Sequence, residues 1–125
     1  MTIKDLIAKA KEVSSKAYAP YSNYKVGAAL LTKSGKVFTG CNVENSSYGL
    51  TNCAERTAVF KAVSEGEREF IELVIYVDSD SLPVPCGACR QVLSEFCSNL
   101  KITVISNKEQ LETTIKELLP LRFKL

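Results

Sequence analysis

Apolar residues near the start of the chain recur at the spacing of an amphipathic helix. Lysines separate them, and the positions that share one helical face are Ile3, Leu6, Ile7, Ala10 and Val13. This periodicity predicts a helix packed against the protein over residues 1–13. Because lysines interrupt the apolar positions, the segment does not resemble a secretory signal peptide.

The next apolar stretches have the two-residue period of β-strands. Residues 25–31 form the short, mainly apolar run KVGAALL, and residues 36–43, KVFTGCNV, alternate between two faces. The turn sequence Lys33-Ser34-Gly35 lies between them. We therefore expect the two strands to form a β-hairpin.

Helical spacing returns after the polar stretch ENSSYGLTN. Small residues then fall four positions apart, at Ala54, Ala58 and Ala62. They predict a helix over residues 53–63 whose small face can lie close to a sheet. We expect Thr51 or Asn52 to cap the N-terminus of this helix.

The rest of the chain predicts two more strands with a helix between them. Residues 71–77, IELVIYV, form an unbroken apolar run, which is typical of a strand covered on both faces. Residues 86–96 have helical spacing, and residues 101–106, KITVIS, predict the next strand. The last stretch, residues 107–125, predicts a short edge strand and a helical turn before Pro120.

This order of elements predicts one three-layer α/β/α domain over residues 1–125, with a mixed sheet of about five strands. The 125 residues, of which 46% are hydrophobic, are enough for one core. The net charge is only +2 and no run of Lys or Arg occurs, so no nucleic-acid partner is indicated. No apolar run approaches the ~20 residues that cross a bilayer, so we expect no membrane partner.

The chain contains five cysteines and no histidine. Without histidine, proton transfer near neutral pH must use a carboxylate or a perturbed Cys, Lys or Tyr. An odd number of cysteines fits a disulfide framework poorly. Since no secretory signal is recognised, we expect reduced thiols in a cytoplasmic protein.

Two of the predicted helices begin at cysteines, one at Cys53 and the other at Cys86, with Cys89 one turn later. Helix N-termini that follow strands can converge at one crevice of an α/β sheet, where they favour thiolates. Three thiolates would form a zinc site with one open position. Cys97 lies roughly 12 Å further along the helix and cannot share the metal. Cys41 is more typical of a small buried hydrophobic residue in a strand.

The sequence Cys86-Gly87-Ala88-Cys89 alone also fits a redox pair or a purely structural metal site. A thioredoxin-type pair precedes most of its sheet, whereas only one clearly predicted strand follows Cys89. The redox interpretation also leaves Cys53 without a role. A structural zinc site would need a fourth protein ligand.

Glu55 follows Cys53 by two positions, which turns its side chain by about 200° around the helix. It should therefore not bind the same metal, but it can reach a water in the crevice and transfer protons. The simpler interpretation is a first-turn Glu that stabilises the helix dipole. Zinc with three thiolates has a net charge of −1, so Arg56 or Arg90 is a candidate to compensate it.

The combination of Cys53-Ala54-Glu55 with Pro85-Cys86-Gly87-Ala88-Cys89 resembles the zinc-deaminase signature, in the variant with cysteine in place of the histidine ligand. Further matching stretches are YSNYKVGAAL from Tyr21, GCNVENSSYGLTNCAERTA from Gly40, PCGACRQVLSEF from Pro85 and ELLP from Glu117. Over nearly its full length the chain resembles cytidine deaminases of the small homotetrameric class.

This resemblance implies a cytidine deaminase-like fold and a hydrolase that converts cytidine and deoxycytidine to uridine and deoxyuridine in pyrimidine salvage. One Zn²⁺ per subunit would be held by Cys53, Cys86 and Cys89. Hydroxide would attack C4 of the pyrimidine, Glu55 would shuttle protons, and ammonia would leave. The implied assembly is a homotetramer whose pockets are completed by neighbouring subunits.

The resemblance also implies substrate contacts. Asn42 and Glu44 would bind ribose hydroxyls, although both also fit a polar exit from a strand. Tyr24, where the family commonly has phenylalanine, would lie against the base or sugar. The backbone of Ala54 would bind the pyrimidine edge. Phe123 resembles the C-terminal aromatic residue that crosses into a neighbouring pocket, and a local plug is its alternative role.

Three other functions fit parts of this pattern. A deaminase of blasticidin S would share the size and the three-cysteine site, but Asn42 and Glu44 favour an intact ribose. A nucleic-acid deaminase would need a basic surface. A catalytically silent zinc-binding module would need neither Glu55 nor the pair that contacts the sugar.

Overall fold

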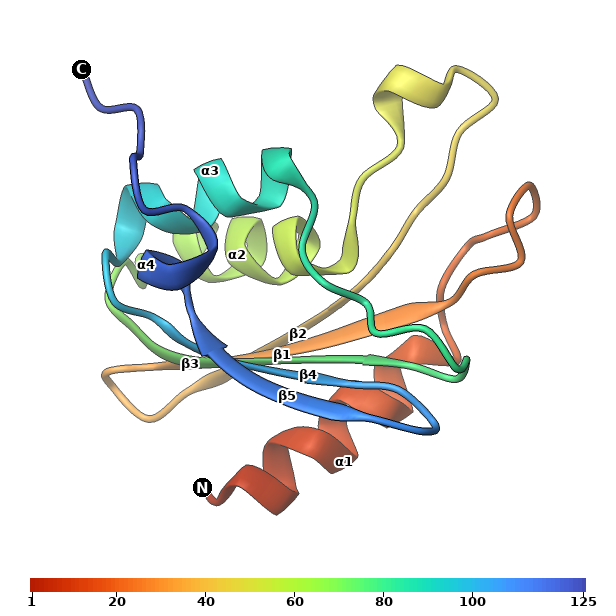
Figure 1. The fold of residues 1–125 in the computed structure, drawn as a ribbon, viewed down its shortest axis with the longest axis horizontal. Coiled ribbons are helices and arrows are strands. Elements are labelled where there is room, and N and C mark those ends of the chain that lie inside the picture. The colour runs from red at the N-terminus through yellow and green to blue at the C-terminus, as the bar shows by residue number, and fades with distance from the viewer.

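The computed structural model describes residues 1–125 (Figure 1). In chain order, its elements are α1 (Ile3–Ser14), β1 (Val26–Thr32), β2 (Val37–Cys41), the 3₁₀ turn η1 (Tyr48–Leu50), α2 (Ala54–Ser64), β3 (Phe70–Val77), α3 (Gly87–Phe96), β4 (Lys101–Ile105), β5 (Gln110–Thr114) and α4 (Ile115–Leu118). Every helix and strand predicted from the sequence is present, including the short strand and helical turn near the C-terminus. None of the helices has the length and apolar composition that a membrane crossing requires.

The five strands form one mixed sheet in the order β2-β1-β3-β4-β5. β3 and β4 are parallel, and all other neighbouring pairs are antiparallel. A parallel pair needs a crossover connection, which α3 supplies. The β1–β2 hairpin turns at Gly35, whose φ of +92° lies in the region that favours glycine.

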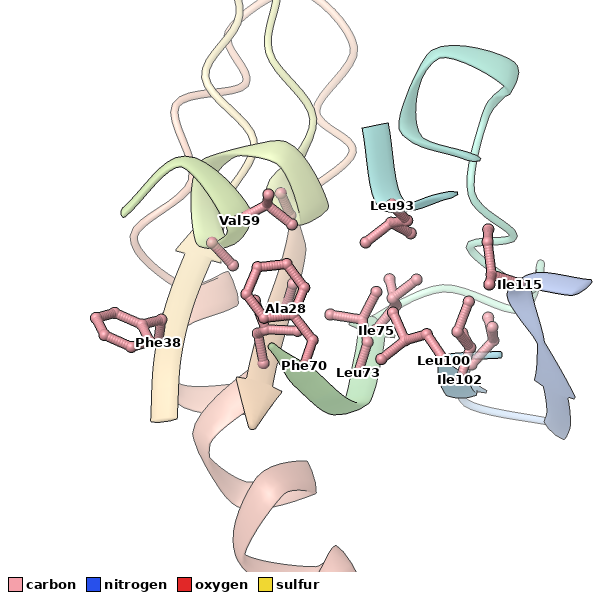
Figure 2. Close-up of a cluster of buried hydrophobic side chains, with 14 of the residues drawn as sticks. Ala28, Phe38, Val59, Phe70, Leu73, Ile75, Leu93, Leu100, Ile102 and Ile115 are labelled. Carbon is pink, nitrogen blue, oxygen red and sulfur yellow. The ribbon is translucent and has the colours of Figure 1, made fainter. Parts of the chain in front are cut away.

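Helices cover both faces of this sheet, as the three-layer prediction requires (Figure 1). On one face, α1 buries Leu6 and Ala10 against Ala29, Val74 and Ile105. On the other face, α2 and α3 cover the main core (Figure 2). Its buried side chains include Leu30, Phe38, Val59, Phe70, Leu73, Ile75, Leu93, Leu100, Ile102 and Ile115. β3 contributes to both clusters, so its unbroken apolar run was correctly interpreted as a strand covered on two faces.

The N-terminus of α2 differs from the prediction by one residue. Its N-cap is Cys53, with φ −76° and ψ 156°, and no side chain caps the helix. The prediction of Thr51 or Asn52 as the cap is therefore wrong. Asn52 instead donates a hydrogen bond from Nδ2 to Thr57 Oγ1 at 3.0 Å, which ties the preceding loop to the first turns of the helix.

Two glycines allow helices to lie close to the sheet. A Cβ atom on Gly40 in β2 would be 2.5 Å from Ala54 O and 2.5 Å from Ala58 N, both backbone atoms of α2. On the opposite face, a Cβ atom on Gly27 in β1 would be 2.0 Å from Ala10 O of α1. The small face of α2 and Gly40 together determine how closely the first turn of α2 approaches the sheet.

Candidate metal centre and active site

The N-termini of α2 and α3 bring three cysteines together. Cys53 is the N-cap of α2, Cys86 is the N-cap of α3, and Cys89 lies in the first turn of α3. Their Sγ atoms all lie within 4.8 Å of one another, and the Cys53 and Cys86 sulfurs are 3.8 Å apart. Both helices therefore begin at cysteines, as predicted, and their ends converge.

The sulfur cluster has the dimensions of a zinc site. Zinc–sulfur bonds of about 2.3 Å in a tetrahedron place two sulfurs about 3.8 Å apart. Neither remaining cysteine joins the cluster. Cys97 packs beside the main core, as predicted, whereas Cys41 is half-buried in β2 instead of fully buried. Three sulfurs without a fourth fit one zinc ion per chain with an open coordination position.

The cluster also favours the charged form of one sulfur. The pKa of Cys53 falls to about 5, mainly because the Cys89 thiol acts as a hydrogen-bond donor toward it. Burial raises this pKa, and the hydrogen bond and charge of Arg56 lower it further. The pKa of Cys89 is raised, first by its hydrogen bond to Cys53 and then by burial. Cys53 is therefore the more acidic of the two thiols, and metal binding, which requires thiolates, would release the remaining proton.

Arg56, and not Arg90, contacts the sulfurs. Arg56 Nη2 donates a hydrogen bond to Cys53 Sγ at 3.3 Å, and this contact raises the pKa of the guanidinium. Its buried Nε has no hydrogen-bond partner. Arg90 donates to the backbone carbonyls of Pro85 and Leu118 instead. The candidate role of Arg90 as a donor to sulfur is therefore wrong, while Arg56 is placed to compensate a negative cluster.

Glu55 lies beside the cluster without joining it. Only 5% of its surface is exposed, although it is in the first turn of α2. Burial raises the pKa of its carboxyl to about 7, and the negative charge at Cys53 adds to this effect. A carboxyl with a pKa near neutrality can both accept and release a proton at physiological pH.

Glu55 and two of the cysteines line one cavity of about 260 Å³. The lining residues are Tyr24, Val26, Asn42, Thr51, Cys53, Ala54, Glu55, Leu82, Pro83, Val84 and Cys86. The sequence interpretation missed the wall formed by residues 82–84. These residues belong to the run SDSLPVP, residues 79–85, whose position directly before Cys86 is the one sequence signal that it borders the site.

The two candidate ribose ligands occupy different positions. Asn42 is buried and lines the cavity, where its Oδ1 accepts from Val26 N–H at 2.8 Å and its Nδ2 donates to Tyr24 O at 2.7 Å. Glu44 lines an adjacent hollow that shares only Thr51 with the cavity.

Glu44 is bound to the loop that follows α1. Its carboxylate accepts hydrogen bonds from the N–H groups of Tyr21 and Ser22, at 2.9 and 3.2 Å, and from the Ser22 hydroxyl. The Ser22 hydroxyl is the main cause of the lowered pKa of Glu44. Both candidate ribose ligands thus hold residues 21–26, which lead from the loop after α1 into β1, against the segment after β2.

The other three candidate substrate contacts are divided between the cavity and the surface. Tyr24 lines the cavity, and burial raises the pKa of its hydroxyl, with a smaller effect from the charge of Glu55. Ala54 is buried and lines the cavity next to Glu55. Phe123 does not reach the cavity: its side chain is 67% exposed, and its backbone carbonyl accepts a hydrogen bond from Gln91. A local plug is therefore not its role within one chain.

Gly40 should affect the metal centre because it determines the position of α2. Gly40→Ala would force backbone atoms of α2 apart from β2 and displace the turn that carries Cys53. We expect a loss of about 1–3 kcal/mol in the free energy of unfolding together with weaker metal binding. Urea unfolding and titration with Co²⁺ measure the two effects.

Gly27→Ala is the matched control for this substitution. It introduces the same kind of backbone clash against α1, which carries no candidate ligand. We expect a similar loss of stability with unchanged Co²⁺ affinity. Equal Co²⁺ affinities for Gly40→Ala and the unmodified protein would contradict the proposed effect on α2.

Comparisons with known proteins agree with this geometry. Residues 1–105 match the model of the cytidine and deoxycytidylate deaminase zinc-binding region. Cytidine deaminase of Sporosarcina psychrophila is 50% identical over 122 residues, which cover 96% of this chain and 90% of that protein. Blasticidin-S deaminase of Bacillus cereus is 32% identical over 110 residues, which cover 82% and 79% of the two chains.

The fold comparison gives the same result. The crystal structure of cytidine deaminase from Burkholderia pseudomallei matches with a TM-score of 0.94 and 50% identity, covering 98% of this chain and 100% of that one. The family model covers most of the chain, and a relative of half-identical sequence covers nearly all of it. This chain therefore belongs to the cytidine and deoxycytidylate deaminase family.

Proposed function

We propose that this chain catalyses the zinc-dependent hydrolytic deamination of cytidine and deoxycytidine to uridine and deoxyuridine, with release of ammonia. The observation that carries the proposal is the buried Glu55 beside an open three-cysteine cluster in one cavity. A structural metal site needs neither an open position nor a buried acid next to it.

The three cysteines, Glu55 and Arg56 each have a part in this reaction. Cys53, Cys86 and Cys89 would hold a zinc ion, which would act as a Lewis acid toward water. Glu55 accepts the proton of the attacking water and delivers a proton to the 4-amino group, so that water and cytidine become uridine and ammonia. Arg56 stabilises the sulfurs through its hydrogen bond to Cys53.

The cavity walls bind and orient the substrate in this proposal. Asn42 still has one N–H group and one lone pair for a ribose hydroxyl, since each of its amide atoms makes one hydrogen bond within the chain. Glu44 binds a second hydroxyl from the adjacent hollow. Tyr24 packs against the base or sugar, and backbone groups of Ala54 bind the pyrimidine edge.

We also propose a homotetramer in which neighbouring subunits complete each pocket. The cavity of about 260 Å³ is slightly smaller than the ~300–1,000 Å³ typical of ligand pockets. Tyr48 and Leu50 in η1 are 77% and 70% exposed, and Phe123 extends from the C-terminal tail. These exposed apolar side chains support contacts with further copies, with Phe123 reaching a neighbour's pocket.

We further propose the domain organisation, the zinc content and the cellular location of the enzyme. The chain works as one domain of residues 1–125 with one Zn²⁺ per subunit. All five cysteines are free, and the three zinc ligands among them must stay reduced, which supports a cytoplasmic location. Cytidine deamination there would serve pyrimidine salvage.

The proposal is tested by incubating the purified zinc-loaded protein with cytidine, deoxycytidine and blasticidin S. We expect the first two to lose ultraviolet absorbance as uridine and deoxyuridine form, and blasticidin S to react much more slowly. Blasticidin S is the second candidate substrate because a blasticidin-S deaminase is 32% identical to this chain. Deamination of blasticidin S alone would contradict the assignment of cytidine and deoxycytidine as substrates. No reaction with any amine would support a silent zinc-binding module.

A further inference from the structure

Arg90 is a charged side chain directly after Cys89 that the proposed reaction does not use. It is half-buried in the first turn of α3, one position after Cys89. Its Nε donates a hydrogen bond to Pro85 O at 2.8 Å, and its Nη1 donates to Leu118 O at 3.0 Å. One guanidinium thus joins the loop before Cys86 to the last residue of α4.

The loop of residues 81–85 has no other hydrogen bond to the rest of the protein. Pro83 and Pro85 have no backbone N–H, and the Val84 N–H bonds to Leu82 O within the loop. The bond from Arg90 is the only hydrogen bond that reaches residues 81–85 from outside that segment. The same segment forms one wall of the cavity and leads directly into Cys86.

The second contact of Arg90 satisfies a helix end. Leu118 is the last residue of α4, where carbonyl groups have no partner within the helix. α4 and the tail after it lie beside α3 (Figure 1). Gln91 donates to Phe123 O, and Arg122 donates to Ser94 O, so the tail is attached along the length of α3.

From these contacts we infer that Arg90 is a positioning residue, which holds Pro85 and therefore Cys86 at the metal centre and attaches that loop to α4. The inference rests on the proposed zinc site. A planar guanidinium can donate to two carbonyls in fixed directions, whereas a lysine ammonium reaches them only as a flexible point charge. Loss of Arg90 should therefore weaken metal binding, although Arg90 makes no hydrogen bond to the sulfur of any cysteine in the cluster.

The test is a Co²⁺ titration of metal-free protein, followed by the absorption of cobalt–thiolate bonds. Arg90→Met keeps most of the side-chain stem and removes both hydrogen bonds. We expect its Co²⁺ affinity to fall by about 10–100-fold, as is usual when a residue that supports a metal ligand is lost. Arg90→Lys should show a smaller loss, and it serves as the test variant if Arg90→Met does not fold.

Arg122→Met is the matched control. Arg122 also donates to a backbone carbonyl of α3, but at Ser94, far along the helix from Cys86. We expect the wild-type Co²⁺ affinity for this variant, even if its melting temperature falls as much as that of Arg90→Met. A general loss of stability would lower both affinities alike.

Three results would overturn the inference. The first is an unchanged Co²⁺ affinity in the folded Arg90 variants, which would show that the metal centre forms without Arg90 and that Arg90 does not position it. The second is an equal loss in Arg122→Met, which would assign the effect to the tail as a whole. The third is the absence of cobalt–thiolate absorption in the wild-type protein, which would contradict the metal centre itself and the role of Arg90 with it.

Discussion

Glu55→Gln is expected to lower kcat for cytidine by about 10²–10⁴-fold, the usual contribution of a general acid–base group. Glutamine has nearly the same size and fills the same buried position, but it cannot take up or release a proton. Because Glu55 does not belong to the cysteine cluster, zinc should remain bound. Steady-state kinetics and zinc analysis on the same preparation measure both quantities.

Glu65→Gln provides the control for this variant. Glu65 is exposed at the C-terminal end of α2, on the same helix as Glu55 but away from the cavity. Its replacement should leave kcat unchanged. Near-normal turnover by a zinc-loaded Glu55→Gln protein would show that another group transfers the protons.

Loss of a sulfur ligand should abolish both zinc binding and activity. Cys86 is exposed, so Cys86→Ala removes little packing and the fold should survive. Two thiolates remain, and zinc sites with fewer than three protein ligands are rare. We expect zinc content to fall from about one per chain toward zero, and turnover of cytidine to fall below detection.

Cys97→Ala separates this effect from the general loss of a thiol. Cys97 follows the same helix but packs against the main core, outside the sulfur cluster. We expect a reduced melting temperature with normal zinc content and normal turnover. Full activity of a zinc-free Cys86→Ala protein would refute the metal-dependent mechanism.

The sequence predicted the layers of the fold because local patterns and tertiary burial agree in most elements. The apolar run of residues 71–77 correctly predicts a strand covered on both faces, because α1 covers one face of β3 and the main core covers the other. The close packing of α2 was foreseen from its alanines. The distance between α2 and the sheet also depends on Gly40 in β2. The alanine pattern of α2 alone therefore could not predict this distance.

The site was predictable where its residues lie at helix starts, and unpredictable where they depend on contacts between loops. Cys53 and Cys86 could be brought together because each lies at the start of a helix, and helix N-termini that follow strands converge at one crevice of an α/β sheet. Arg56 and Arg90 had equivalent positions in the sequence, one residue after a site residue. Only the direction of each side chain on its helix distinguishes the donor to sulfur from the donor to Pro85.

The hydrogen bonds of Asn42 and Glu44 could not be read from spacing. Both side chains bind residues 21–26, which precede the β1–β2 hairpin or form its first residue, so the hairpin lies between the partners in the sequence. A pattern of alternating polar residues gives the face on which they lie but not their partners. The prediction of the N-cap of α2 was wrong for a similar reason. Asn52 donates its hydrogen bond to Thr57, and Cys53 occupies the N-cap position.

Zinc K-edge X-ray absorption on the wild-type protein tests the metal centre most directly. We predict three sulfur neighbours at about 2.3 Å and one oxygen or nitrogen neighbour at about 2.0 Å. A shell of four sulfurs, or a protein purified under reducing conditions that holds no zinc at all, would contradict an open metal site beside Glu55.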